Sequence, residues 1–280
     1  MTTIKLTKMQ GCGNDFVIID YDEFLKTGLA MSELAKKVCD RHFGVGADGM
    51  FIPKTDTQNT DIGWYFYNND GTTAQMCGNG IRCFAKYAYD KKLVGKKKFS
   101  VETLAGIITP ELLDDGNVKV DMGCPVLEDE KIPFDGERVV KVLDKEFSIN
   151  PVSMGNPHCV IFIDGKDGNT MDYALKYGPH MEKHPFFPEK TNTEFVRVIS
   201  KTEVEMSVYE RGCGITLACG TGACATQVAC ILNNLTENKI KVNLPGGAVT
   251  IEWQGSLADT RKHVFMTGPA TYSFIADYIL

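Results

Sequence analysis

Alternation of apolar and polar residues predicts a strand, a turn and a second strand at the start of the chain. Ile4 and Leu6 alternate with polar residues, the glycine-rich stretch 11–15 interrupts the pattern, and an apolar run resumes over 16–19. An aromatic run over 64–67 predicts a further strand with large side chains on both faces.

Apolar residues at three- and four-residue spacing predict several helices. One begins at Ser32, which we expect to cap it, and ends near Arg41 and His42. The other helices are expected over residues 84–89, 171–177 and 225–232. Further strands are expected within a meander over 99–120, and over 137–149, up to Asp164 and over 204–209. The pattern therefore predicts an α/β fold.

Two similar motifs, each placed directly before a helical run, organise the sequence. They are Cys77-Gly78-Asn79-Gly80 and Cys219-Gly220-Thr221-Gly222, and their cysteines are 142 residues apart in a chain of 280. The same offset relates Gly13-Asn14 to Gly155-Asn156, and Tyr67-Asn68 to Tyr209-Glu210. One register kept across these places predicts two similar lobes that arose by duplication.

A cysteine at the start of a helix is well placed for acid–base chemistry. The first turn has unpaired N–H groups and the positive end of the helix macrodipole, and both favour a thiolate over a thiol. Gly78 and Gly220 let the backbone approach a ligand closely, so each helix start can also hold a carboxylate or a phosphate. The sequence thus predicts one reactive thiol and one anion pocket in each half.

The composition excludes several classes of protein. A chain of 280 residues, 43% hydrophobic and 24% charged, is ordinary for a globular protein with two domains. A net charge of -6 and a single short basic cluster, Lys96 to Lys98, argue against a nucleic-acid partner. The N-terminal residues have no signal-peptide pattern and no apolar stretch reaches membrane-spanning length, so we expect a cytoplasmic protein with no membrane partner.

Other local patterns point to no metal and no cofactor. None of the ten cysteines forms Cys-x-x-Cys, and in this context we expect reduced thiols and no zinc site. Residues 44–49 formally match a dinucleotide-binding fingerprint, but a helix precedes them and a strand follows, so we interpret them as a glycine-rich turn. Six cysteines without a helix-start context are expected to be small buried residues: Cys12, Cys39, Cys124, Cys159, Cys213 and Cys230.

Two thiols suit a reaction that takes a proton from one face of a carbon and returns one to the other. A single base cannot reach both faces without moving, so stereoinversion needs a thiolate and a thiol, here Cys77 and Cys219, facing each other across a cleft. N–H groups at the two helix starts can stabilise the charge that develops on an amino-acid carboxylate. Glu210 or His158 can hold the substrate ammonium, and Arg211 a second carboxylate.

The order and spacing of the motifs resemble those of the diaminopimelate epimerase family, cofactor-independent enzymes of bacterial lysine biosynthesis. Proline racemase and phenazine-pathway relatives share the fold of the wider superfamily, but the asparagines and the Glu210-Arg211 pair are more similar to the epimerase. The motifs span the chain: Lys8 to Phe16, Asn68 to Gly71, Cys77 to Gly80, Gly155 to His158, Glu210 to Gly212, Ala218 to Gly222 and Met266 to Pro269.

The resemblance implies two α/β lobes, each a mixed sheet curled around a central helix, over residues 1–121 with 266–280 and over 122–265. It implies that Cys77 and Cys219 are the acid–base pair of an isomerase that interconverts LL- and meso-diaminopimelate without pyridoxal phosphate. A homodimer is also implied. The implied substrate-binding set is Asn14, Asn68, Gly78, Asn79, Asn156, Asn192, Glu210, Arg211, Gly220 and Thr221, with His158 in a supporting role.

Three positions depart from the family pattern and leave alternatives open. Gly49 stands where some members have a glutamine that touches substrate, Ile215 stands where many have glutamate, and Cys12 replaces a commoner apolar residue. The first two leave a racemase of another amino acid, such as histidine, as an alternative. A thiol redox sensor, in which Cys77 and Cys219 join as a disulfide, is the non-catalytic alternative.

Overall fold

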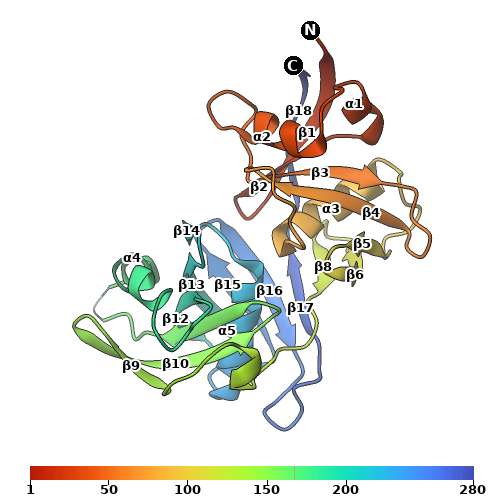
Figure 1. The fold of residues 1–280 in the computed structure, drawn as a ribbon. Helices are drawn as coiled ribbons and strands as arrows, with labels where there is room; N and C mark the ends of the chain where they lie inside the picture. The colour runs from red at the N-terminus through yellow and green to blue at the C-terminus, as the bar shows by residue number, and fades with distance from the viewer. Residues whose placement is uncertain (167) are drawn as a thin grey trace. The chain divides into compact units, whose positions relative to one another are not determined.

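The computed structural model describes residues 1–166 and 168–280, which form two compact units (Figure 1). Unit 1 comprises Met1–Val120 and Gly268–Leu280, and unit 2 comprises Asp121–Thr267. Both units mix strands and helices, as the sequence predicted. Within the two described ranges, every helix is too short or too polar to cross a membrane.

Unit 1 is built on a mixed sheet of seven strands. Their order across the sheet is β18 (Thr271–Ile279), β1 (Thr3–Gly11), β2 (Asn14–Ile18), β3 (Gly49–Lys54), β4 (Ile62–Asn68), β5 (Val101–Thr103) and β6 (Gly106–Ile108). A hairpin follows, β7 (Pro110–Leu112) and β8 (Val118–Asp121), so the meander expected over 99–120 is confirmed. The helices are α1 (Tyr21–Leu25), α2 (Met31–Cys39) and α3 (Gly78–Asp90).

The sheet of unit 1 is covered by helices on both faces because its central strands are apolar on both sides. On one face, Val17, Met50 and their neighbours pack against Leu34, Ala35 and Val38 of α2. Alternate residues of the same strands point the other way. They form an aromatic cluster that meets α3 at Phe84: Phe16, Phe51, Trp64 and Phe66.

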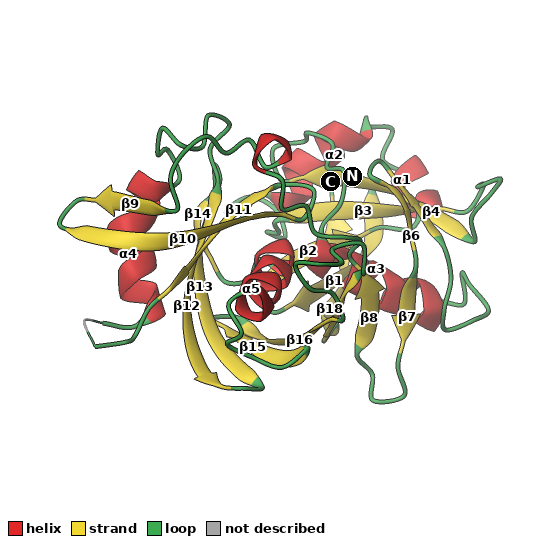
Figure 2. Ribbon diagram, turned by 90° about the horizontal axis from the view of Figure 1, so that it is seen from below, coloured by secondary structure: helices red, strands yellow, loops and turns green. Residues whose placement is uncertain are grey.

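Unit 2 repeats this plan with α5 (Gly220–Leu232) in the place of α3. Figure 2 shows α5 among the strands, and it packs against β10, β11, β12 and β16. A second helix, α4 (Thr170–Met181), lies against β12 and β13. A short 3-10 helix spans Asp129–Lys131, and β14 (Gly214–Thr216) pairs with β13. The strand order is β17 (Val264–Gly268), β16 (Gly247–Trp253), β15 (Lys239–Leu244), β13 (Glu203–Glu210), β12 (Asn192–Ser200), β11 (Pro157–Phe162), β10 (Lys145–Ser153) and β9 (Val139–Val142).

Six strands of unit 2 repeat six strands of unit 1 in order and direction. Along β1-β2-β3-β4-β5-β6 the pairings alternate antiparallel and parallel, and the series β10-β11-β12-β13-β15-β16 alternates in the same way. β1 and β10 correspond residue for residue at the offset of 142. The predicted duplication is therefore confirmed at the level of topology.

The two central helices match at both ends. Each is 13 residues long and begins after a cysteine that serves as its N-cap, Cys77 for α3 and Cys219 for α5. Each ends before a residue with a left-handed backbone, Lys92 with φ 58° and Asn234 with φ 55°. The next residue is a leucine whose N–H bonds back five positions, Leu93 to Ala88 and Leu235 to Cys230, both at 2.9 Å. This pattern is a Schellman motif, and its repetition identifies α3 and α5 as copies.

The helix predicted from Ser32 differs from the prediction at both ends. α2 begins at Met31 with Ala30 as its N-cap, so Ser32 lies inside the first turn and does not cap the helix. The helix ends at Cys39, earlier than expected, because the Asp40 carboxylate accepts the N–H groups of His42 and Phe43 at 2.7 and 2.8 Å. A local side-chain acceptor here replaces the helical carbonyl.

Candidate functional site

Unit 1 gathers four of its predicted site residues at the start of α3. Cys77 has an extended backbone, and its Sγ accepts a hydrogen bond from Gly80 N at 3.4 Å. The same sulfur donates to Asn14 Oδ1 at 3.3 Å, and Asn79 Nδ2 donates to that oxygen at 3.3 Å. Gly78, the first residue of α3, is buried. We call this group the unit 1 cluster.

The amide of Asn14 is held by a carboxylate that the sequence reasoning missed. Asn14 Nδ2 donates to Asp48 Oδ2 at 2.6 Å, and Arg41 donates to Asp48 Oδ1 at 2.7 Å. Because a carboxylate only accepts hydrogen bonds, the amide must turn its NH2 toward Asp48 and its oxygen toward Cys77. Asp48 lies in the glycine-rich turn 44–49, and that placement was its only signal in the sequence.

Asn68 lies apart from these contacts, at the end of β4. Its side-chain Nδ2 donates to Thr72 Oγ1 at 3.0 Å, and its carbonyl accepts the N–H of Gly71, which closes a tight turn. Gly49 of β3 is its cross-strand neighbour. A methyl group on Gly49 would meet Phe66 Cε2 and the Tyr67 carbonyl at 2.8 Å, so the ring of Phe66 occupies the space that a longer side chain would need.

Unit 2 gathers a second group at the start of α5, which we call the unit 2 cluster. Cys219 is 6% exposed, and its Sγ accepts a hydrogen bond from Gly222 N at 3.3 Å. Thr221 Oγ1 lies 3.5 Å from the same sulfur and accepts from Asn156 Nδ2 at 3.4 Å. Gly220, the first residue of α5, is buried. The two clusters thus share a cysteine cap, buried helix-start glycines and an asparagine at the 142-residue offset.

His158 is buried with both ring nitrogens engaged. Nε2 lies 3.0 Å from Asn156 Oδ1, and Nδ1 lies 2.7 Å from Glu194 Oε1. His158 and Glu194 have no exposed side-chain surface. The expectation that His158 can hold a substrate ammonium is therefore hard to meet, because neither nitrogen is turned toward solvent. Glu194 was visible in the sequence only as one residue of a polar run and was not singled out.

Glu210 is the last residue of β13 and Arg211 follows it. Hydrogen bonds from several other segments hold the turn that they begin. Thr216 donates a hydrogen bond to Glu210 Oε1. Asn192, which is buried, accepts from Arg211 N at 2.9 Å and donates to the Pro157 carbonyl at 2.8 Å. The Arg211 guanidinium donates to the Glu189 carbonyl at 3.2 Å. In this structure, therefore, the side chain of Asn192 holds the turn that carries Arg211.

Electrostatics at the unit 2 cluster oppose the thiolate that the helix start was expected to favour. Burial raises the pKa of Cys219 well above its usual value, and the Glu210 and Glu194 carboxylates raise it further. The hydrogen bonds from Thr221 and Gly222 lower the pKa but are outweighed. Burial also raises the pKa of Glu210, while Thr216 and His158 lower it. At Cys219, burial and the two carboxylates therefore favour the thiol over the thiolate, because together they outweigh the hydrogen bonds from Thr221 and Gly222.

Of the described residues, His158, Glu194 and Cys219 bring potential metal-ligating atoms within 4.8 Å of one another. Two ligands on one tetrahedral zinc ion are about 3.3 Å or more apart. The 2.7 Å between His158 Nδ1 and Glu194 Oε1 is shorter and is a hydrogen-bond distance. These two atoms therefore do not fit one ion together, and we interpret the group as a hydrogen-bonded cluster.

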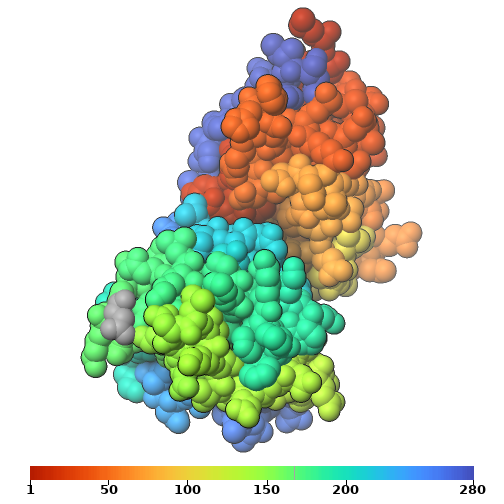
Figure 3. All heavy atoms as spheres, turned by 60° about the vertical axis from the view of Figure 1, so that its left-hand side comes forward, coloured from red at the N-terminus to blue at the C-terminus, as the bar shows by residue number. Residues whose placement is uncertain are grey.

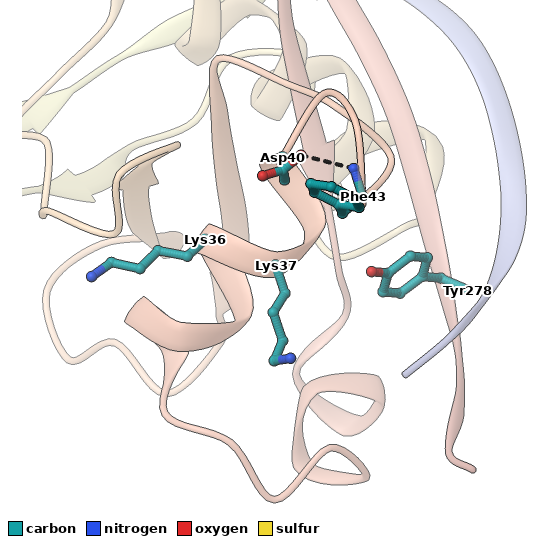
Figure 4. Close-up of a pocket in the computed structure, with 5 residues that line it drawn as sticks. All are labelled: Lys36, Lys37, Asp40, Phe43 and Tyr278. Carbon is teal, nitrogen blue, oxygen red and sulfur yellow. Dashed lines mark hydrogen bonds between the residues drawn. The ribbon is translucent and has the colours of Figure 1, made fainter.

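The other cysteines and the surface cavity add no chemistry to these clusters. The ten cysteines are reduced thiols, but Cys124 and Cys213 are exposed, so the expectation that they are buried is wrong. A cavity of 260 Å³ in unit 1 is lined by residues outside the predicted site (Figure 4). These are Lys36, Lys37, Asp40, Phe43 and Tyr278, and Phe43 bonds to Asp40 through its backbone N–H.

Comparison with known proteins identifies the family of the chain. The family model described as diaminopimelate epimerase matches residues 6–128 and 151–273. A diaminopimelate epimerase of Desulfitobacterium hafniense is 49% identical over 97% of this chain and 96% of its own length. One from Synechocystis is 45% identical over 97% of both chains.

Solved structures with low sequence identity share the fold. A phenazine biosynthesis protein of the PhzF family from Bacillus anthracis has a TM-score of 0.72 at 16% identity, covering 100% of both chains. A hydroxyproline epimerase from Agrobacterium vitis has a TM-score of 0.71 at 12% identity, covering 100% of this chain and 93% of its own. Since the family model covers most of the chain and relatives are nearly half identical over its whole length, the chain belongs to the diaminopimelate epimerase family.

Proposed function

We propose that this protein interconverts LL- and meso-2,6-diaminopimelate by a two-base mechanism in which Cys77 and Cys219 exchange the α-proton. It is then an isomerase that supplies lysine and peptidoglycan precursors in the cytoplasm. The observation that carries the proposal is the repeated helix start, where each cysteine caps a 13-residue helix and its sulfur accepts the N–H three residues later. The sequence identity of 43–49% to diaminopimelate epimerases supports the choice of substrate.

In this mechanism one sulfur removes the proton of the α-carbon and the other returns a proton to the opposite face. The roles exchange when the reaction runs in reverse. Burial and two nearby carboxylates raise the pKa of Cys219 and so favour its thiol form. In the direction in which Cys219 is the proton donor, Cys77 is the base. One substrate must reach both sulfurs for this reaction.

The N–H groups at the helix starts bind the carboxylate of the reacting amino acid. The first turn of a helix offers N–H groups that have no partner within the helix, and these align with the macrodipole. Gly78 and Asn79 supply them in unit 1, and Gly220 and Thr221 in unit 2. They lower the energy of the carbanion-like transition state, in which the carboxylate carries additional charge. No pyridoxal phosphate or metal ion takes part in this proposal.

The remaining polar residues hold the two amino-acid ends of the substrate. Glu210 binds the α-ammonium, and the position of its carboxylate beside Cys219, where Thr216 donates to it, supports this role. Arg211 binds the distal carboxylate, and Asn192 fixes the backbone from which it projects. Three asparagines complete the substrate-binding residues: Asn14, Asn68 and Asn156. An amide oxygen accepts from an ammonium and an amide NH2 donates to a carboxylate, so the orientation of each amide determines which substrate group it binds.

We further propose that the protein is a homodimer formed through β18. This strand is at the edge of the unit 1 sheet and pairs with β1 on one side. Figure 3 shows the C-terminal residues at the surface of unit 1, beside those of the N-terminus. Three large apolar side chains of this strand are exposed in the single chain: Phe274, Ile275 and Ile279. An exposed edge strand with apolar residues favours association with another chain. A second copy of β18, antiparallel across a twofold axis, provides a self-complementary partner.

Incorporation of deuterium at the α-carbon tests the proposed activity. The purified protein is incubated in heavy water with LL-diaminopimelate, and exchange and product are followed by NMR and chiral chromatography. Exchange accompanied by meso product is expected, and its absence would falsify the assignment. A panel that includes histidine separates this activity from a racemase of another amino acid. Activity that is unchanged after the reduced protein is oxidised would argue against both the catalytic role of the thiols and a redox sensor.

A further inference from the structure

The corresponding asparagines of the two units present opposite ends of their amides to the cysteine of their own unit. In unit 1, Asn14 turns its oxygen toward Cys77, because its NH2 is bound by Asp48. In unit 2, Asn156 turns its oxygen toward His158 and its NH2 toward Thr221, which lies beside Cys219. The two corresponding asparagines thus have opposite amide orientations. Asp48 determines the orientation of Asn14, and His158 determines that of Asn156.

The contacts of His158 determine which way the hydrogen bonds point in unit 2. Nε2 must carry a hydrogen, because it faces the carbonyl oxygen of Asn156, which can only accept. The bond between Nδ1 and Glu194 carries a further hydrogen, and this carboxylate holds the ring in place at 2.7 Å. The NH2 of Asn156 then donates to Thr221 Oγ1. Asn156 then occupies one of the two lone pairs of that oxygen, and the relay requires its O–H to donate to the sulfur of Cys219, 3.5 Å away, a contact in which either atom can be the donor.

Glu194 is confined to this position by the start of α5. A methyl group at Gly222 would come within 2.7 Å of Glu194 Oε1, so the carboxylate lies directly against the first turn of the helix. Glu194 Oε2 has no side-chain or backbone hydrogen-bond partner within residues 1–166 and 168–280, so its interaction with His158 is its principal one.

We propose that Glu194 accepts from Nδ1 of His158 and fixes its ring, and that His158, Asn156 and Thr221 then form a directed hydrogen-bond relay in which Nε2–H, the amide NH2 and the hydroxyl each point toward the sulfur of Cys219. The relay stabilises the thiolate that Cys219 must become when it acts as the base, and so it counters the burial and the carboxylates that disfavour that charge. Glu194 and Thr221 are positioning residues in this relay. Unit 1 lacks the same direction, because the sulfur of Cys77 donates to Asn14. The catalytic role of the relay rests on the proposed function, whereas its effect on the Cys219 thiol does not.

The charged and titratable groups that face Cys219 come from three strands and must be held constant in a test. They are Glu210 on β13, Glu194 on β12 and His158 on β11. A change at Glu194 alters both the relay and the local charge, and these two effects on Cys219 have opposite signs. Thr221 is neutral, so substitutions at Thr221 isolate the hydrogen bond.

The decisive comparison is Thr221→Val against Thr221→Ser. Val keeps the shape and removes the hydroxyl, whereas Ser keeps the hydroxyl. The rate at which iodoacetamide alkylates Cys219 is measured by peptide mass spectrometry as a function of pH, without substrate, with exposed Cys124 of the same chain as the reference. For Thr221→Val we expect a rate about three- to tenfold lower at a fixed pH, and a profile displaced to higher pH. Thr221→Ser is expected to follow the wild type.

A shift in Thr221→Ser as large as that in Thr221→Val, or no shift in either, would overturn the proposal. The second measurement uses the unaltered protein and is independent of folding in any variant. The ¹⁵N shifts of the His158 ring are expected to show a protonated Nε2. An unprotonated Nε2 would refute the direction of the relay. Neither readout needs the substrate, so failure of the epimerase assay and failure of the relay are distinguishable.

Discussion

The sulfur of Cys219 accepts a hydrogen bond from the backbone N–H of Gly222 at 3.3 Å, three residues further along the chain. The same contact joins Cys77 to Gly80 at 3.4 Å. In both helices a cysteine thus takes the place of the serine or aspartate that usually caps a helix. The cap fixes the rotamer of each sulfur and brings it to the positive end of the helix, so the same contact serves both the fold and the chemistry.

Replacing Gly80 or Gly222 by alanine is expected to impair the site through steric conflict. A methyl group would lie 2.6 Å from Phe51 Cζ at Gly80 and 2.7 Å from Glu194 Oε1 at Gly222. Overpacking of this kind costs about 1–3 kcal/mol of stability. Urea unfolding and epimerase assays should show losses in both variants. Gly95→Ala is the control, since nothing lies within 4 Å of its added methyl group.

Removal of either capping thiol should abolish epimerisation in both directions. Cys77→Ala and Cys219→Ala are each expected to lose at least about a hundredfold in kcat, because general acid–base catalysis is worth about a hundred- to ten-thousandfold. Chiral chromatography of the diaminopimelate isomers measures the loss. Cys124→Ala, at an exposed cysteine, is expected to retain wild-type activity. Full activity in either capping variant would refute the two-base assignment.

Glu210→Gln is expected to stabilise the protein near neutral pH while impairing its activity. Burial raises the pKa of Glu210 in the folded protein above the ordinary value of 4.5. The folded state therefore binds this proton more tightly than the unfolded state, and the contribution to stability is present below the unfolded pKa and lost as pH rises through the folded one. Glutamine keeps the acceptor for Thr216 without the buried charge.

The free energy of unfolding in urea, measured at about pH 4 and pH 7, checks this sign. The variant should be more stable than the wild type at the higher pH, and the difference should shrink toward the lower one. A difference that grows as the pH falls would contradict the assignment of a raised pKa to Glu210.

Gly49→Gln tests whether the missing glutamine of the family pattern can simply be restored. Its Cβ would meet Phe66 Cε2 and the Tyr67 carbonyl at 2.8 Å, so we expect a destabilisation of about 1–3 kcal/mol. The double variant Gly49→Gln with Phe66→Leu should regain part of this loss, because the smaller side chain vacates the space. Equal stability of the single variant and the wild type in urea would show that Phe66 moves without cost.

Ile275→Lys is expected to weaken the proposed dimer by placing a charge on the exposed face of β18. Ile275 is 61% exposed in the single chain, so the substitution should leave the fold of the monomer unchanged. Sedimentation velocity measures the change in association, and thermal unfolding checks the fold. Leu257→Lys, at an exposed leucine in unit 2, is the control and should not change the oligomeric state. Identical sedimentation of wild type and Ile275→Lys would exclude β18 as the interface.

Much of the fold was predictable because the two halves of the sequence repeat the same motifs at a constant offset. The offset of 142 that joins Cys77 to Cys219 also joins β1 to β10 and the ends of α3 to those of α5. Helix ends were less predictable: Ser32 has the composition of a cap, but packing of Leu34, Ala35 and Val38 places the start of α2 at Met31. Capping is worth about 1 kcal/mol, whereas the burial of one large apolar side chain is worth more.

The sequence by itself determined the family to which the chain belongs and the residues of the candidate site: two cysteines before glycine-rich helix starts, and the asparagines around them. These features are local in sequence or repeated at one offset, so no tertiary contact is needed to find them. Only the tertiary structure decided how each asparagine amide is oriented, and that the thiol form of Cys219 is favoured. Those properties depend on Asp48, His158 and Glu194, which are distant from the cysteines in the sequence. They also depend on the removal of water from around Cys219, which no pattern in the sequence shows.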